Sequence, residues 1–247
     1  KEVWRQKAAN YKDGYSITGA PLVANGVLIT GISGGEYGTR GFLDGWDPAT
    51  GEKLWRRYTT AAPGEPGGDS WAGSEAYLEG GAPTWITGSY DPDLDLVFWG
   101  TGNGGPWNPT GPRKGNNLYI NCALAIKPKT GEIAWYFQFS PNDPYDYDGV
   151  NELVLAEIPV DGKPHKVIMQ ANRNGFFYVL DRATGKLLAA SPFVDRINWA
   201  EGIDLETGRP IDTEMTTFVR NTPEMEEAVE VWPSALGGKN WMPMSFD

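Results

Sequence analysis

Asp47-Pro48-Ala49-Thr50-Gly51-Glu52-Lys53-Leu54-Trp55 recurs later in the sequence as Lys127-Pro128-Lys129-Thr130-Gly131-Glu132-Ile133-Ala134-Trp135. Two shorter copies follow, Asp181-Arg182-Ala183-Thr184-Gly185 and Asp204-Leu205-Glu206-Thr207-Gly208. Each copy is typical of a tight turn with glycine at a positive φ, and in the long copies the next strand carries a tryptophan that can pack between units. Four copies at uneven intervals predict an all-β fold, a β-propeller whose units are separated by loops of different length.

The ends of the chain fall inside this repeat. Glu52-Lys53-Leu54-Trp55 aligns with Lys1-Glu2-Val3-Trp4, so the sequence starts just after the position of a Thr-Gly pair, and residues 241–247 supply no closing strand. We therefore expect residues 1–247 to form one partial propeller domain, truncated at both ends and holding about half of the blades. Because the outer blade faces would be unpaired, the chain alone is expected to be poorly stable or to self-associate.

Composition excludes several classes of protein. Lys+Arg 21 against Asp+Glu 32 gives a net charge of −11, which opposes nucleic-acid binding. The single histidine, His165, and the single cysteine, Cys122, are too few for zinc sites, a Cys-His nucleophile or an intrachain disulfide. A Ser-His-Asp triad is also disfavoured. No apolar stretch approaches bilayer length, so we expect no membrane span.

Several segments are predicted to be strands. Residues 117–126 alternate, which would place Leu118, Ile120, Cys122, Leu124 and Ile126 on one face, and Cys122 is then a small core residue. Residues 27–30, 96–99 and 176–180 are apolar at successive positions, as expected of strands covered on both sides by neighbouring blades. The 32 glycines and 19 prolines favour short strands and turns over long helices.

Polar loops follow the apolar strands. Ser33-Gly34-Gly35-Glu36 offers backbone amides and a carboxylate, and Asn103 offers an amide oxygen. Asp146 and Asp148 would point the same way if their segment is extended, and two such charges repel unless a cation lies between them. Arg173 is suited either to a neighbouring acid or to an anionic ligand. For each loop a simple turn or a structural ion pair stays open as the alternative.

Taken together, these loops closely resemble those of the PQQ-dependent quinoprotein alcohol dehydrogenases, the methanol and ethanol dehydrogenase family. The resemblance runs from Gly14-Tyr15-Ser16-Ile17-Thr18 to Gly238-Lys239-Asn240-Trp241 and preserves the loop order. The Asp-x-x-Thr-Gly-x-x-x-Trp repeat is similar to that family's tryptophan-docking motif. The resemblance implies an eight-bladed propeller, of which this chain would be the central part.

The resemblance also implies a role for individual residues. Asp146 matches the catalytic carboxylate. The expected metal ligands are Glu36, Asn103, Asp146 and Asp148. The expected PQQ contacts are Thr18, Ser33, Gly34, Gly35, Trp85, Arg173 and Asn240. Calcium-dependent members usually have a small uncharged residue in place of Asp148, so the resemblance implies a lanthanide(III) ion, with Ca²⁺ as the alternative.

The activity implied is oxidation of primary alcohols to aldehydes in the periplasm, with PQQ as cofactor, the metal as Lewis acid and a cytochrome c as electron acceptor. The resemblance leaves a homodimer of the full-length form open, and the fragment by itself is expected to be inactive. Two alternatives remain: a PQQ-dependent sugar or polyol dehydrogenase, and a non-catalytic propeller scaffold with the same repeat. A scaffold would need the Thr-Gly turns and tryptophans but not the polar loops.

Overall fold

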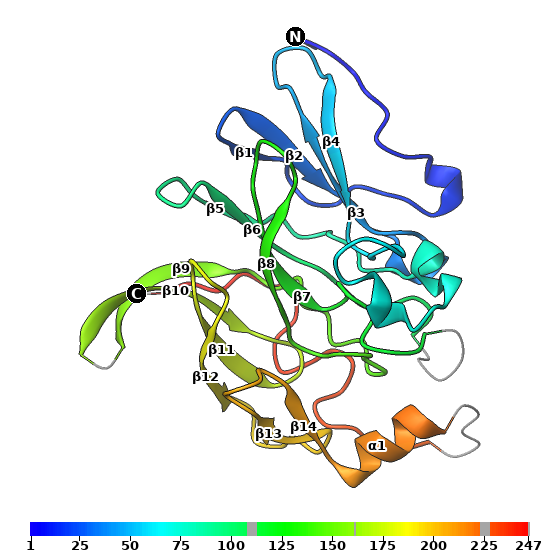
Figure 1. The fold of residues 1–247 in the computed structure, drawn as a ribbon, viewed down its shortest axis with the longest axis vertical. Coiled ribbons are helices and arrows are strands. Elements are labelled where there is room, and N and C mark those ends of the chain that lie inside the picture. The colour runs from blue at the N-terminus through cyan, green and yellow to red at the C-terminus, as the bar shows by residue number, and fades with distance from the viewer. Residues whose placement is uncertain (108–112, 161, 223–227, 247) are drawn as a thin grey trace.

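The computed structural model describes residues 1–107, 113–160, 162–222 and 228–246. Three four-stranded antiparallel sheets and a two-stranded hairpin follow one another along the chain (Figure 1). In the described residues one α-helix is present, α1 (Glu214–Asn221), and no helix there is long and apolar enough to cross a membrane. The predicted all-β propeller architecture is confirmed.

The strands have these bounds. The first sheet holds β1 (Leu22–Ala24), β2 (Val27–Gly31), β3 (Phe42–Trp46) and β4 (Lys53–Tyr58). The second holds β5 (Ser89–Asp91), β6 (Leu96–Gly100), β7 (Cys122–Ile126) and β8 (Ile133–Gln138). The third holds β9 (Val154–Val160), β10 (Lys163–Ala171), β11 (Phe176–Asp181) and β12 (Leu187–Pro192). The hairpin consists of β13 (Ala200–Ile203) and β14 (Pro210–Asp212).

Strand order divides the loops between the two ends of each sheet. In every four-stranded sheet the strands pair in sequence order, each antiparallel to the next. The loop between the second and third strands therefore lies at the same end as the connection to the next sheet. The turn between the third and fourth strands, which contains the Thr-Gly repeat, lies at the opposite end.

The repeat forms the predicted turns. Gly51, Gly131, Gly185 and Gly208 all have φ between 69° and 75°, which is the left-handed region that glycine enters without strain. Three of them are covered by a tryptophan of a preceding unit: Trp4 covers Gly51, Trp55 covers Gly131 and Trp135 covers Gly185, whereas Gly208 lies against the Phe137 ring. The indole N–H of Trp55 also donates to the Pro128 carbonyl at 2.9 Å. The prediction that the repeat tryptophan packs between units is confirmed.

Gly131→Ala is expected to destabilise the fold strongly. A Cβ at this position would lie 2.5 Å from the Trp55 ring and would also occupy a left-handed backbone. Strain of about 1–2 kcal/mol and overpacking of about 1–3 kcal/mol should add. Gly64→Ala is the matched control, because Gly64 has φ of 84° but nothing within 4 Å of its added Cβ. Urea denaturation of both variants measures the difference, and equal losses would show that the docking contact contributes nothing.

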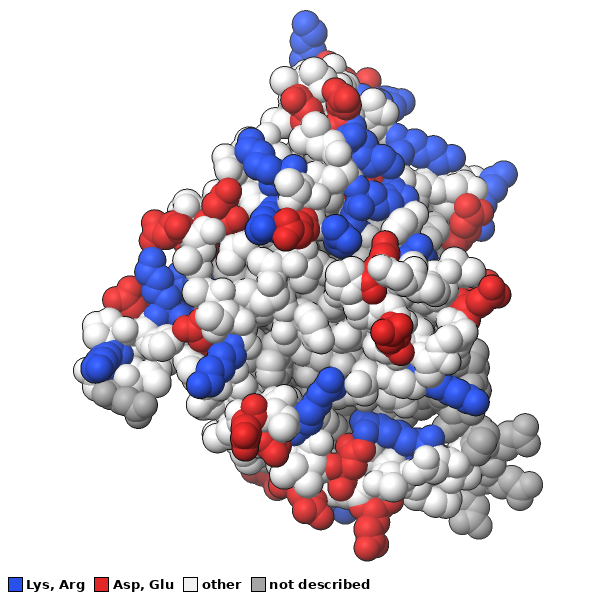
Figure 2. All heavy atoms as spheres, in the orientation of Figure 1, with Lys and Arg blue, Asp and Glu red and all other residues white. Residues whose placement is uncertain are grey.

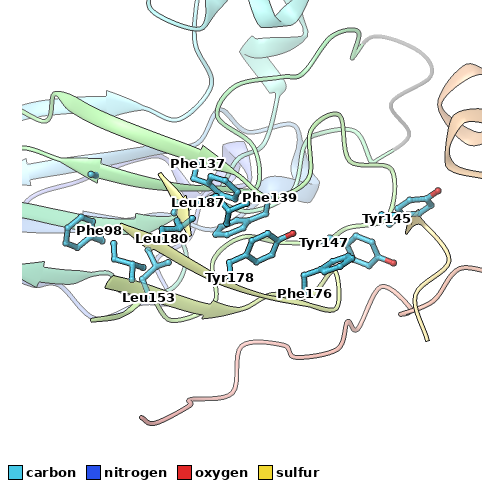
Figure 3. Close-up of a cluster of buried hydrophobic side chains, with 14 of the residues drawn as sticks. Phe98, Phe137, Phe139, Tyr145, Tyr147, Leu153, Phe176, Tyr178, Leu180 and Leu187 are labelled. Carbon is cyan, nitrogen blue, oxygen red and sulfur yellow. The ribbon is translucent and has the colours of Figure 1, made fainter. Parts of the chain in front are cut away.

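Aromatic side chains fill the space between the second and third sheets. Phe137, Phe139 and Tyr178 pack with ring centroids 4.9–5.7 Å apart. Figure 3 shows this cluster running from Phe98 toward Tyr147 and Tyr145, which belong to the connection between the sheets. The core thus extends directly into one of the polar loops predicted from the sequence.

One predicted strand is wrong in extent. Only Cys122–Ile126 forms β7, because residues 118–121 form a turn that follows the left-handed Asn117 and ends at the left-handed Asn121. Within β7 the predicted face is present, because Cys122, Leu124 and Ile126 pack in one core cluster and Ala123 and Ala125 in another, so both faces of the strand are buried. Cys122 is nevertheless a buried core residue, as predicted. The strands predicted at 27–30, 96–99 and 176–180 are present.

Candidate active site

Most of the predicted site residues lie in loops at one end of the sheets. Glu36, Asn103 and Arg173 lie in the loops β2–β3, β6–β7 and β10–β11, which are equivalent in the three sheets. The connections between sheets carry Trp85 and the Asp146–Asp148 pair. The topology therefore brings these segments together although they are widely separated in sequence.

Arg173 is the centre of a polar cluster. Its Nη1 donates to the main-chain oxygen of Asp146 at 2.8 Å and to the Asp146 carboxylate at 3.1 Å. Its Nη2 lies 3.2 Å from the Asp148 carboxylate and donates to Asn240 Oδ1 at 3.0 Å. The segment is not extended at Asp146, whose φ is 63°, yet both carboxylates reach the same guanidinium.

Asn103 joins this cluster through Asp148. Its backbone N–H donates to Asp148 Oδ1 at 2.6 Å, and its side-chain Nδ2 donates to the Gly104 carbonyl. Its Oδ1 is buried and has no hydrogen-bond partner among the described residues. A Cβ at Gly35 would lie 3.2 Å from that oxygen, so the oxygen faces the loop that carries Glu36. Glu36 itself is exposed.

Two carboxylates of the cluster, those of Asp146 and Asp148, have raised pKa values. Burial, and next the negative charge of Asp148, raise the pKa of Asp146 to about 7. Burial raises the pKa of Asp148 to about 6, with Arg173 acting in the opposite direction and Glu36 adding to the rise. Burial is therefore the main reason why both pKa values are raised, in spite of the neighbouring guanidinium.

Thr18 and Trp85 line a neighbouring pocket of about 500 Å³. The Thr18 hydroxyl donates to the Trp85 carbonyl at 3.1 Å, which fixes the two loops against each other. Glu152 and Trp241 also line this pocket. Trp241 follows Asn240, so the pocket and the Arg173 cluster share one C-terminal segment.

The Ser33-Gly34-Gly35 loop is shaped by close packing. Ser33 and Ser16 share a hydroxyl contact of 2.7 Å, which ties this loop to the segment that leads to Thr18. Gly34 has φ of 115°, and a Cβ there would lie 2.1 Å from the Gly14 carbonyl. A Cβ at Gly35 would lie 2.8 Å from the Pro83 ring. Only glycine fits at both positions.

Comparison with known proteins identifies the family. Residues 2–192 match the family described as PQQ, glucose/ethanol/alcohol dehydrogenase, beta-propeller domain. The match covers all three four-stranded sheets. The chain belongs to this dehydrogenase propeller family.

Individual members agree with that assignment. The chain is 43% identical to the quinohemoprotein alcohol dehydrogenase ADH IIB of Pseudomonas putida, over 100% of the chain and 36% of that protein. It is 38% identical to the lanthanide-dependent methanol dehydrogenase of Methylacidiphilum fumariolicum (strain SolV), covering 100% of the chain and 42% of that protein. A structure of a europium-containing methanol dehydrogenase superposes with a TM-score of 0.93 at 37% identity, over 100% of the chain and 45% of that structure. The chain thus spans less than half the length of these relatives.

The residues present suit the groups that this family implies. The groups around Arg173 are carboxylate and amide oxygens, which hard cations prefer, and the Asn103 oxygen, which no described residue bonds, offers one further ligand. Among the described residues no three His, Cys, Asp or Glu side chains form a ready metal cluster. The cation between Asp146 and Asp148 in this structure is the Arg173 guanidinium.

The structure adds residues to which the sequence alone assigned no role. Asp143 is buried in the loop of Asp146 and Asp148, and its carboxylate accepts three hydrogen bonds. Lys239 and Glu152 form an ion pair of 2.6 Å beside the pocket. The Asn-Asp-Pro sequence at 142–144 is typical of a turn in which the aspartate side chain accepts from the following backbone, so the local role of Asp143 could have been predicted from the sequence. The Lys239–Glu152 pair had no local signal, because its members are 87 residues apart.

One face of the molecule carries charge unevenly. Figure 2 shows charged side chains mostly toward the edges of the visible face, while its middle is largely uncharged. The net charge of −11 is therefore not gathered on the middle of that face.

Proposed function

We propose that the protein carrying this chain oxidises primary alcohols to aldehydes, with PQQ and a hard cation bound at the Arg173 cluster and the adjoining pocket. One observation carries the proposal: the carboxylates of Asp146 and Asp148 converge on one guanidinium, beside a buried Asn103 oxygen that has no hydrogen-bond partner in the described part of the chain. The family match and the names of the relatives agree with it.

Seven residues would hold the cofactor. The Trp85 ring offers a flat apolar surface, and Arg173 and Asn240 offer polar groups beside it. The remaining four are Thr18, Ser33, Gly34 and Gly35. When bound, PQQ supplies a two-electron acceptor for the alcohol, and the cation supplies Lewis acidity.

Asp146 would remove the hydroxyl proton of the alcohol. Its Oδ2 contacts Arg173 at 3.1 Å, so we assign Oδ1 as the oxygen that accepts the proton. The left-handed backbone of Asp146 turns its main-chain oxygen onto the same guanidinium. Arg173 thereby orients the proton acceptor by two hydrogen bonds.

Asp148 would set the choice of metal. Glu36, Asn103, Asp146 and Asp148 give three carboxylates and one amide oxygen, and a third carboxylate is neutralised better by a trivalent ion than by Ca²⁺. One relative is named lanthanide-dependent and one solved relative contains europium. We therefore propose a lanthanide(III) ion.

The physiological setting follows the resemblance to quinoprotein dehydrogenases. We propose a periplasmic enzyme that passes its electrons to a cytochrome c. The test is an assay of the full-length protein with PQQ, a lanthanide and an artificial electron acceptor, across primary alcohols, sugars and polyols. Turnover of primary alcohols that requires PQQ supports the proposal. Preference for sugars or polyols would instead identify a PQQ-dependent sugar or polyol dehydrogenase. Absence of any PQQ-dependent turnover would refute the proposal.

Asp148→Asn is expected to weaken activation by La³⁺ about tenfold or more while affecting Ca²⁺ much less. The amide keeps an oxygen that can accept the Asn103 N–H but removes one negative charge. Activation curves of the full-length apo-enzyme with each ion measure the effect. Asp93→Asn is the control, because Asp93 forms an exposed pair with Lys166 at the opposite end of the sheets. Equal activation by both ions, unchanged by Asp148→Asn, would contradict the assignment.

A further inference from the structure

Asp143 lies in the loop of the proposed catalytic carboxylate but contributes no ligand to the cluster. The loop joins β8 to β9 and contains three aspartates, of which Asp146 and Asp148 contact Arg173. Asp143 is 3% exposed and has no contact with Arg173 among the described residues. A carboxylate so deeply buried needs several hydrogen bonds to compensate for lost hydration.

Those hydrogen bonds come from the loop itself and from the β6–β7 segment. Asp143 Oδ1 accepts the backbone N–H of Tyr145 at 3.0 Å, and Oδ2 accepts that of Tyr147 at 2.7 Å. Oδ2 also accepts from Asn121 Nδ2 at 2.9 Å. The fully buried Arg113 donates to the Asp143 main-chain oxygen at 2.9 Å and provides the nearby positive charge.

The two backbone donors flank Asp146. Asp146 has φ of 63°, a left-handed conformation that is uncommon for residues other than glycine, even though aspartate enters it more readily than most, and that the surroundings must maintain. Tyr145 and Tyr147 are anchored by their rings, with hydroxyl contacts of 2.9 Å to Thr216 and 2.6 Å to the Pro233 carbonyl (Figure 3 shows both rings at the end of the core cluster). Ring anchoring fixes where the chain passes, whereas the Asp143 bonds fix how the peptides on either side of Asp146 are turned.

We propose that Asp143 is a positioning residue whose carboxylate holds the left-handed turn at Asp146, so that Asp146 and Asp148 both point at the cation site. This inference rests on the proposed function, since it concerns how the same site achieves its affinity for a hard cation. Residues that orient metal ligands through hydrogen bonds typically change metal affinity by about 10–100-fold when they are substituted.

The test is isothermal titration of LaCl₃ into the full-length, PQQ-loaded, metal-free protein. Asp143→Asn keeps the shape of the side chain but replaces one acceptor oxygen with a donor, so at least one of the tyrosine N–H groups loses its partner. We expect La³⁺ affinity to fall about tenfold or more. An unchanged affinity would overturn the inference.

Asp91→Asn is the matched control for general destabilisation. Asp91 is also a buried aspartate whose Oδ1 accepts two backbone N–H groups of its own turn, those of Asp93 and Leu94, but it lies at the opposite end of the second sheet. It should lower stability and leave La³⁺ affinity unchanged. An equal loss of La³⁺ affinity in Asp91→Asn and Asp143→Asn would overturn the inference, because general loosening would then explain both.

A double variant keeps the test decisive if Asp143→Asn fails to fold. Asp143→Asn combined with Asn121→Asp exchanges the two partners of one buried hydrogen bond, so a carboxylate stays buried there, now on residue 121. Residue 143 then has a single acceptor oxygen for the two tyrosine N–H groups. Weak La³⁺ binding by the double variant supports positioning through those groups, and wild-type affinity overturns it. Failure of the wild-type protein to bind La³⁺ is a separate outcome, which would refute the proposed function and this inference with it.

Discussion

Asp146→Asn is expected to reduce turnover of the full-length enzyme by about 10²–10⁴-fold, the contribution of a positioned general base. An amide oxygen can still accept from Arg173 Nη1 in place of the carboxylate oxygen, so the orientation of the side chain should survive. It is a far weaker proton acceptor. The measurement is the rate at saturating alcohol and saturating La³⁺, because Asp146 is also a proposed metal ligand.

Two further observations make that result interpretable. Bound PQQ, measured by absorbance, should be retained in Asp146→Asn, which separates loss of the base from loss of the cofactor. Asp93→Asn should turn over normally, since its carboxylate is exposed and lies far from the cluster in the fold. Turnover of Asp146→Asn within a few-fold of wild type would remove Asp146 from the mechanism.

Arg182→Met should lower the free energy of unfolding strongly, by about 3–5 kcal/mol. Arg182 belongs to the third copy of the repeat, and its Nη1 pairs with the buried Asp91 of the second sheet at 2.8 Å. Its Nε also donates to the Val167 carbonyl. Removing the guanidinium leaves Asp91 buried without its cation.

Urea denaturation of the full-length protein measures this loss. Arg5→Met is the control, because Arg5 and Glu2 form an exposed pair that should contribute less than about 1 kcal/mol. A loss in Arg182→Met no larger than in this control would show that the contact between the sheets is unimportant.

The same pair has a defined pH dependence. Burial raises the pKa of Asp91, but hydrogen bonds from Arg182 and from two backbone N–H groups outweigh it, so the pKa lies below its usual value. The stabilisation is therefore present above the unfolded pKa of about 3.9 and is lost as the pH falls through the lower folded value.

The sequence predicted what depends on local patterns. The Thr-Gly repeat gave the positive φ of Gly131 and the packing of Trp55 on it, because a tight turn and the strand after it are encoded within nine residues. The loops at Glu36, Asn103 and Arg173 were also found, since each follows an apolar strand. Their convergence follows from sheet topology alone.

Features that depend on distant partners were not predicted. Residues 118–121 have the alternation of a strand but form a turn, because the Leu118 carbonyl accepts from Trp71 and from Ala61 of another segment. The left-handed backbone of Asp146 is supported by Arg173, 27 residues away. One of the hydrogen bonds that the buried Asp143 carboxylate accepts comes from Asn121, 22 residues earlier. No short window of sequence contains these pairs.

The separation of the two ends of each sheet has a consequence for how such proteins can diversify. The Thr-Gly turns that hold neighbouring sheets together occupy one end, while the proposed chemistry occupies loops at the other. Substitutions at the two ends share few contacts, so their effects on stability and on activity should be nearly additive. Stability gained at the docking turns could then offset destabilising changes in the site loops, which leaves those loops free to acquire new substrate preferences.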